Sequence, residues 1–152
     1  MDESKPAHSV VFGGSIARLS VSVRVLGDDL DPEEVTRLLG TAPNFAARKG
    51  DQRQSGSRPF QQRIGIWTFA RTTKPSSEWE LDGAIKALLG RLPSDLDVWR
   101  RLAERYSLDV FCGLFMSSDN QGTDVQPETL RLLADRGLAL SFDLYGPPPG
   151  RE

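Results

Sequence analysis

Hydrophobic and polar residues alternate along residues 18–26 and again along residues 138–144. A period of two is typical of a strand with one buried face and one polar face. We therefore predict a strand at each place, and we expect the two strands to lie in one sheet. The alternating apolar residues are Leu19, Val21, Val23 and Val25 in the first segment and Leu138, Leu140, Phe142 and Leu144 in the second.

Two further strands are expected between these ends. Residues 64–71 place Ile66 and Thr68 on one face and Trp67 and Phe69 on the other. Residues 108–116 form a continuous apolar run that is too short to span a membrane and rich in strand-forming residues, which predicts a central strand buried on both faces.

Four helices are expected between the strands. The first has Asp31 as its N-cap, Pro32 at its first position and Gly40 as its stop. The second begins near Ser76, the third is capped by Asp95 or Asp97, and the fourth begins at Pro127 and ends at Gly137. The residues expected to face inward are Val35, Leu38 and Leu39; Leu81, Ile85, Leu88, Leu89 and Leu92; Leu96, Trp99, Leu102, Ala103 and Tyr106; and Leu130, Leu133 and Ala134.

This order of elements predicts an α+β fold, with a mainly antiparallel sheet of four to five strands and helices packed on it. The helices at Pro32 and Pro127 share the spacing Pro-Glu-x-apolar-x-x-Leu. This repeated spacing indicates two ferredoxin-like strand-helix-strand halves, with the helices at Pro32 and Pro127 covering one sheet face. The middle helical pair would be inserted between the halves and would cover, or extend past, the other face. We expect one domain over residues 16–146, a flexible N-terminal segment over residues 1–15 and a flexible tail over residues 147–152.

Several blocks spread from Leu19 to Tyr145 occur together in one family's order. They resemble the bacterial Domain of Unknown Function 4279 family. The resemblance implies a small standalone prokaryotic protein with no assigned activity or cofactor, so it transfers no catalytic residues. The blocks are Gly27-Asp28-Asp29-Leu30-Asp31-Pro32 with Val35 and Leu38-Leu39-Gly40, Arg48-Lys49-Gly50-Asp51, Gly65-Ile66-Trp67, Asp109-Val110-Phe111-Cys112-Gly113 and Leu140-Ser141-Phe142-Asp143-Leu144-Tyr145.

Composition removes several classes of function. The 152 residues include one Cys and one His, so this chain alone forms neither a disulfide nor a Cys/His zinc centre, and a cytoplasmic location is expected. Acidic residues outnumber basic ones 21 to 19, which argues against nucleic-acid binding. No apolar run is long enough to cross a membrane.

Single residues offer little catalytic chemistry. Cys112 lies within an apolar run, and the one histidine, His8, lies in the expected flexible segment, so we expect Cys112 to be a core residue. Asp28, Asp29 and Asp31 lack the spacing of a calcium loop and fit a turn and an N-cap. We expect no metal or other cofactor.

The connection from Thr41 to Arg63 is the strongest binding candidate. It is expected to be a long loop or a ragged edge strand, and connections of this length are often either functional or mobile. Five cations stand against Asp51 alone, so the segment could hold an anionic ligand or dock an acidic partner surface. Phe60 and Trp67 could supply an apolar anchor. The cations are Arg48, Lys49, Arg53, Arg58 and Arg63.

The last strand directs Asp143, Ser141 and Tyr145 to the face opposite its leucines. If helices cover that face, Asp143 needs a partner such as Arg24, because an unpaired buried charge is costly. If the face stays open, these residues could line a polar groove together with Ser20, Ser22 and Arg24.

Two hypotheses for function follow. The first is a non-enzymatic binding module that recognises a protein partner, with an immunity-type role as one version. The second is a small-ligand binder, or a weak hydrolase that acts through carboxylates on the polar sheet face. Exposed edge strands and tryptophans would also allow a homodimer.

Overall fold

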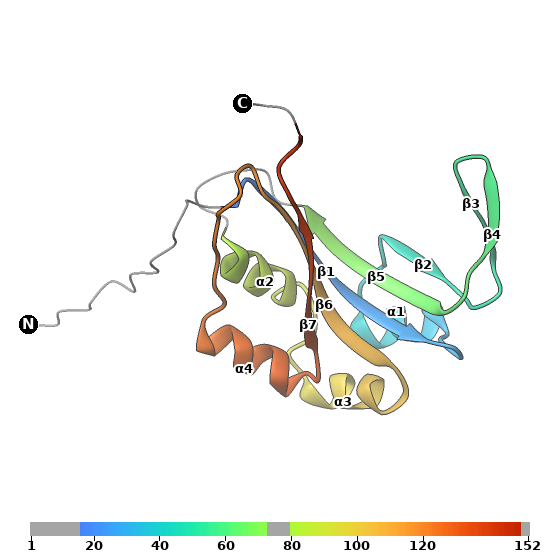
Figure 1. Ribbon diagram of the computed structural model, residues 1–152. Helices are drawn as coiled ribbons and strands as arrows, with labels where there is room; N and C mark the ends of the chain where they lie inside the picture. The colour runs from blue at the N-terminus through green and yellow to red at the C-terminus, as the bar shows by residue number, and fades with distance from the viewer. Residues whose placement is uncertain (1–15, 73–79, 150–152) are drawn as a thin grey trace, which may run out of the picture.

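The computed structural model describes residues 16–72 and 80–149 (Figure 1). The predicted N-terminal segment 1–15, the last three residues of the predicted tail 147–152 and the predicted helix start near Ser76 lie outside these residues. Among the described residues, no helix has the length and apolar character that crossing a membrane requires. The elements are β1 (Arg18–Gly27), α1 (Pro32–Leu39), β2 (Phe45–Ala47), β3 (Gln52–Ser55), β4 (Arg58–Gln61), β5 (Gly65–Thr72), α2 (Leu81–Leu89), α3 (Leu96–Arg105), β6 (Ser107–Phe115), α4 (Pro127–Asp135) and β7 (Ala139–Tyr145).

Five strands form one sheet in the order β2-β5-β1-β6-β7. The β6–β7 pair is parallel and the other three pairs are antiparallel. Strands β3 and β4 form a separate antiparallel hairpin. The α+β class and the mostly antiparallel sheet are therefore confirmed, and the first and last predicted strands share one sheet with β6 between them.

Helices α1, α2, α3 and α4 pack on a single face of this sheet, which we call the helix face (Figure 1). The alternating valines of β1 point to that face and are almost fully buried. Register places the apolar residues of β6 and Trp67 of β5 beside them, and Trp99 of α3 closes the same core. Burial of this continuous apolar surface is the main source of stability.

The prediction of two equivalent ferredoxin-like halves is wrong. Strand β5 returns beside β1 in the antiparallel direction, whereas α4 connects β6 to β7 as a crossover between parallel neighbours. Helices α2 and α3 were expected to cover the other sheet face or to extend past it, but they pack on the same face as α1 and α4. Within residues 16–72 and 80–149, four helices therefore cover one side of the five strands, and none of them lies on the opposite face.

The inward face of α4 differs from the prediction. Thr129 and Leu133 are buried, whereas Leu130 is 46% exposed and Ala134 is also exposed. Residues i and i+4 share a helix face, so the buried stripe is shifted by one residue from the predicted one. Leu96 and Ala103 of α3 are likewise exposed, although Trp99, Leu102 and Tyr106 are buried as predicted.

Residues 41–63 contain more structure than a loop. Strand β2 forms one edge of the sheet, and β3 and β4 then form the hairpin. Gly56 has φ 63°, at the first position of the two-residue loop between the hairpin strands. A positive φ is required there in a type II′ turn, and glycine adopts it without steric cost.

Candidate functional site

The β3–β4 hairpin projects from the β2 side of the sheet (Figure 1). Backbone hydrogen bonds fix its base: the Gly50 amide donates to the Gln62 carbonyl and the Gln62 amide donates to the Asp51 carbonyl, each at 2.8 Å. The Asp51 carboxylate also accepts from the Arg48 amide at 2.8 Å. The hairpin is therefore an ordered projection rather than a loose loop.

Arg53 fastens the hairpin to the sheet. Its guanidinium lies 4.0 Å from the ring centroid of Phe45 on β2 and 5.3 Å from that of Phe60 on β4. It also donates to the Gln62 side-chain oxygen at 2.9 Å. Arginine can stack on aromatic faces while its edge donates hydrogen bonds, so Arg53 positions the hairpin rather than offering a free charge.

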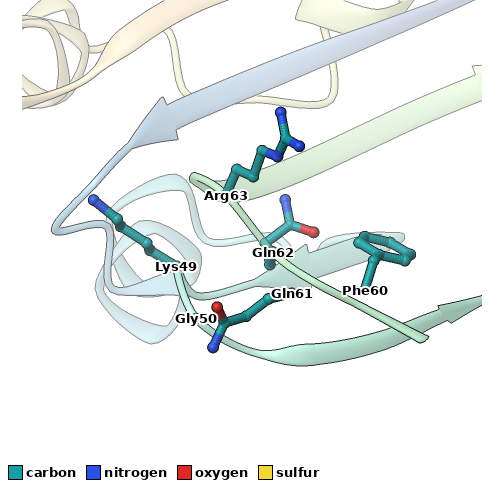
Figure 2. A pocket seen from close by; sticks show the side chains of 6 residues that line it. All are labelled: Lys49, Gly50, Phe60, Gln61, Gln62 and Arg63. Atoms are coloured by element: carbon teal, nitrogen blue, oxygen red, sulfur yellow. The ribbon is translucent and has the colours of Figure 1, made fainter.

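A hollow of about 760 Å³ lies at the base of the hairpin. Figure 2 shows Lys49 and Phe60 at its opposite ends, with Gln62 and Arg63 between them. Residues just before β3, at the end of β4 and just after β4 thus bring two cations, two amides and one aromatic side chain together. Such a lining can receive an acidic side chain beside an apolar one.

The cations of this segment differ in their ion pairs. Arg48 pairs with Asp31 at 2.9 Å and Lys49 lies 3.5 Å from Asp28, so both tie the hairpin base to the β1–α1 turn. Among the residues that the structure describes, Arg58 and Arg63 form no ion pair, and both are exposed. These two supply the freest positive charge of the hairpin.

Trp67 is not part of this site. It is fully buried on the helix face, and its indole nitrogen donates to the Thr36 hydroxyl of α1 at 3.0 Å. The prediction that Trp67 anchors a partner is therefore wrong, because the alternation along β5 directs this side chain away from Phe45 and into the core. Phe60 and Ile64, each 39% exposed, are the apolar residues that a partner could reach near the hairpin.

The sheet face opposite the helices is polar in part, and we call it the open face. Its central group joins three strands: Asp109 of β6 accepts from Arg24 of β1 at 2.8 and 2.5 Å and from the Ser141 hydroxyl of β7 at 2.9 Å. The bond to Asp109 raises the pKa of the Arg24 guanidinium. That guanidinium also lies 4.2 Å from the ring centroid of Phe111.

A second group lies at the β7 end of the open face. The Tyr145 hydroxyl donates to Asp143 at 2.6 Å, which raises the pKa of Tyr145. The Tyr145 ring stacks on the Phe115 ring with centroids 4.5 Å apart. The Arg18 guanidinium lies over the same Phe115 ring, 4.0 Å from its centroid. Gly113 lies beneath this stack, where an added Cβ would come within 2.8 Å of the Ser20 hydroxyl.

The structure therefore divides the predicted site residues other than Trp67 between two places. Arg48 and Lys49 lie at the base of the hairpin and Arg53 within it, whereas Arg24, Asp143 and Tyr145 lie on the open face. Arg24 pairs with Asp109 instead of Asp143. The residue that the sequence interpretation missed is Asp109, and the signal was present: it is the single charge in a nine-residue strand that is otherwise apolar or small.

Each aspartate of the β1–α1 turn lies close to a basic side chain. Asp28 faces Lys49, Asp29 lies 4.0 Å from Arg105 and Asp31 pairs with Arg48. Asp31 also accepts from the Glu33 amide at 3.1 Å as the predicted helix cap. Within the described ranges, no group of three or more His, Cys, Asp or Glu side chains is arranged to hold a metal ion.

Cys112 is fully buried in the core, as predicted, and burial raises the pKa of its thiol to about 12 from an ordinary value of 9.0. The folded state thus favours the neutral thiol. This contribution to stability is complete below about pH 9 and is lost as the pH rises toward 12, by about 1.4 kcal/mol per pH unit.

We expect the free energy of unfolding of the wild type to fall more steeply above pH 9 than that of Cys112→Ala. Urea unfolding at pH 8, 9.5 and 10.5 measures both slopes, and the other titrating groups are common to the two proteins. Parallel curves would show that the thiol is accessible to solvent or is not desolvated.

The comparisons with known proteins give one match. Residues 17–147 match a family model described as Domain of unknown function (DUF4279). No curated protein and no solved structure matches the chain.

Proposed function

The chain belongs to the DUF4279 family, and we propose that it is a non-enzymatic binding module whose β3–β4 hairpin recognises an acidic surface of a protein partner. The observation that carries this proposal is the ordered projection of a basic segment from a chain whose formal net charge is −2. An immunity-type protein, which binds and neutralises a toxin, is one version of such a module.

Three features of the hairpin support binding to a protein. Arg58 and Arg63 offer positive charge, Phe60 and Ile64 offer exposed apolar area, and the hollow between Lys49 and Arg63 can accept a protruding side chain. An apolar anchor surrounded by charges that attract the partner is the usual organisation of a protein interface. The network that holds Arg53 also means that little order must be gained on binding, which favours affinity.

Charge reversal at the free cations tests the proposal. We expect Arg58→Glu with Arg63→Glu to weaken binding of a partner captured from the native host, and then purified, by at least tenfold, with a smaller effect at high salt because the interaction is screened. Isothermal titration calorimetry at two salt concentrations measures this change.

The matched control is Arg91→Glu with Arg131→Glu, which changes the net charge equally at exposed positions outside the hairpin. Binding by the control should stay near the wild-type value. Equal weakening by the two double variants would assign the effect to net charge, and failure to capture any stoichiometric partner at low and moderate salt would remove the basis of the proposal.

A further inference from the structure

Strand β7 is a free edge of the sheet. It pairs with β6 on one side and, within the part of the chain that the structure describes, has no strand on the other. The Met116 amide donates to the Tyr145 carbonyl at 2.9 Å. The Tyr145 backbone groups therefore point toward β6. Because backbone groups point alternately to the two sides of a strand, the amides and carbonyls of Leu140, Phe142 and Leu144 point away from β6, to the free edge.

The side chains of this edge are unusually apolar for a surface strand. Phe142 is 50% exposed and Leu144 is 64% exposed, and both lie on the helix face at positions that the described helices leave uncovered. Natural edge strands are commonly protected by proline, lysine, a bulge or shortness. The seven residues of β7 contain neither proline nor lysine, whereas the opposite edge strand, β2, has three residues.

We propose that β7 pairs in the antiparallel direction with β7 of a second copy of this chain, about a two-fold axis at Phe142. Phe142 is the central residue of the strand, so this axis pairs all seven residues. It also places the outward backbone groups of Leu140, Phe142 and Leu144 opposite the same groups of the second copy, which satisfies each donor and acceptor.

The side chains are self-complementary in this register. On the helix face, Phe142 meets its own copy and Leu144 meets Leu140. On the open face, Asp143 lies opposite Ser141 and Tyr145 opposite Ala139, so the two carboxylates are not directly opposed. An axis at Asp143 would instead place two carboxylates directly opposite, which is destabilising. An axis at Ser141 would pair only five residues.

This self-complementarity favours a second copy over an unrelated strand. The resulting dimer would have one continuous ten-stranded sheet with the two β3–β4 hairpins toward its outer ends, roughly 45 Å apart at the usual strand spacing. One strand pair buries less area than the ~800 Å² per partner of a standard stable interface, so we expect association in roughly the micromolar range.

Sedimentation equilibrium of the full chain across a concentration series tests the dimer. Phe142→Lys brings two ammonium groups together at the axis, and we expect its dissociation constant to rise at least tenfold. Leu96→Lys adds the same charge at an exposed leucine of α3 and should dimerise like the wild type. A wild type that stays monomeric up to roughly 1 mM, or equal effects of the two variants, would overturn the proposal.

Disulfide formation tests the register. Directly opposed residues in a hydrogen-bonded pair have Cα atoms about 5.5 Å apart, within the range that a disulfide spans, so Phe142→Cys should cross-link to its own copy under mild oxidation. Leu144→Cys should not, because the two copies of that residue are offset by four residues, roughly 13 Å. A mixture of Leu140→Cys and Leu144→Cys chains should cross-link.

Native Cys112 is buried and gives no background in these reactions. Cross-linking of Leu144→Cys with itself would overturn the register. The double variant Arg58→Glu with Arg63→Glu should dimerise normally, which separates a failure of this proposal from a failure of the proposed function of the hairpin.

Discussion

Replacing Trp67 with alanine is expected to lower the free energy of unfolding by about 3–5 kcal/mol. The side chain is fully buried between β5 and α1, and its indole nitrogen donates to Thr36 at 3.0 Å. The substitution removes buried aromatic surface, leaves a cavity in the core and takes away the donor that Thr36 accepts from. Urea denaturation with coincident fluorescence and circular dichroism measures the loss.

Two further variants separate the effect of burial from the effect of the lost hydrogen bond. Phe60→Ala removes an aromatic side chain that is 39% exposed and should cost less than about 1 kcal/mol. Trp67→Phe keeps most of the buried area but loses the indole donor, and we expect an intermediate loss of about 1–2 kcal/mol. If Trp67→Ala left stability unchanged while partner binding was lost, Trp67 would lie in the interface and the assignment to the core would be wrong.

Periodicity predicted the elements well because the buried positions of a helix or strand are apolar at regular intervals along the sequence. The valines of β1 alternate because one face of that strand packs against helices, and Asp31 precedes Pro32 because the first turn of α1 needs a cap. Strand pairing was not predictable in the same way. Whether β5 returns beside β1, or α4 connects β6 to a parallel neighbour, depends on contacts between residues far apart in the chain.

Whether an apolar face is covered was also hard to predict at the edges of the sheet. Phe142 and Leu144 continue the alternation of a buried strand, but β7 is an edge strand and the helices do not cover its end. The pattern therefore indicated the correct face without indicating whether anything covers it. The same reasoning applies to α4, where Thr129 takes the buried position expected for Leu130.

The positive charge of the candidate site was predictable, but the contacts of each cation were not. The count of cations over residues 41–63 identified the basic segment, yet sequence could not show that Arg53 stacks between Phe45 and Phe60 while Arg58 and Arg63 form no ion pair among the described residues. The partner of Arg24 depends on register. Position 24 of β1 lies opposite Asp109 of β6, and Asp143 is one strand further away.

Asp109→Ala is expected to lower the free energy of unfolding by about 2–3 kcal/mol. Its side chain is 11% exposed and accepts two bonds from Arg24 and one from Ser141, so one carboxylate joins β1, β6 and β7. Truncation leaves the Arg24 guanidinium without its acceptor. Because the Arg24 side chain is 26% exposed and stacks on Phe111, water compensates in part, which keeps the loss below that of a fully buried pair.

A double-mutant cycle with Arg24→Ala isolates the pair, and we expect a coupling free energy of about 1–2 kcal/mol. Asp143→Ala is the matched control, because its carboxylate accepts from the exposed Tyr145 and its loss should cost less than about 1 kcal/mol. Additive single effects in the cycle would mean that Arg24 and Asp109 act independently. Asp109 would then stabilise the open face through its hydrogen bond from Ser141 rather than through Arg24.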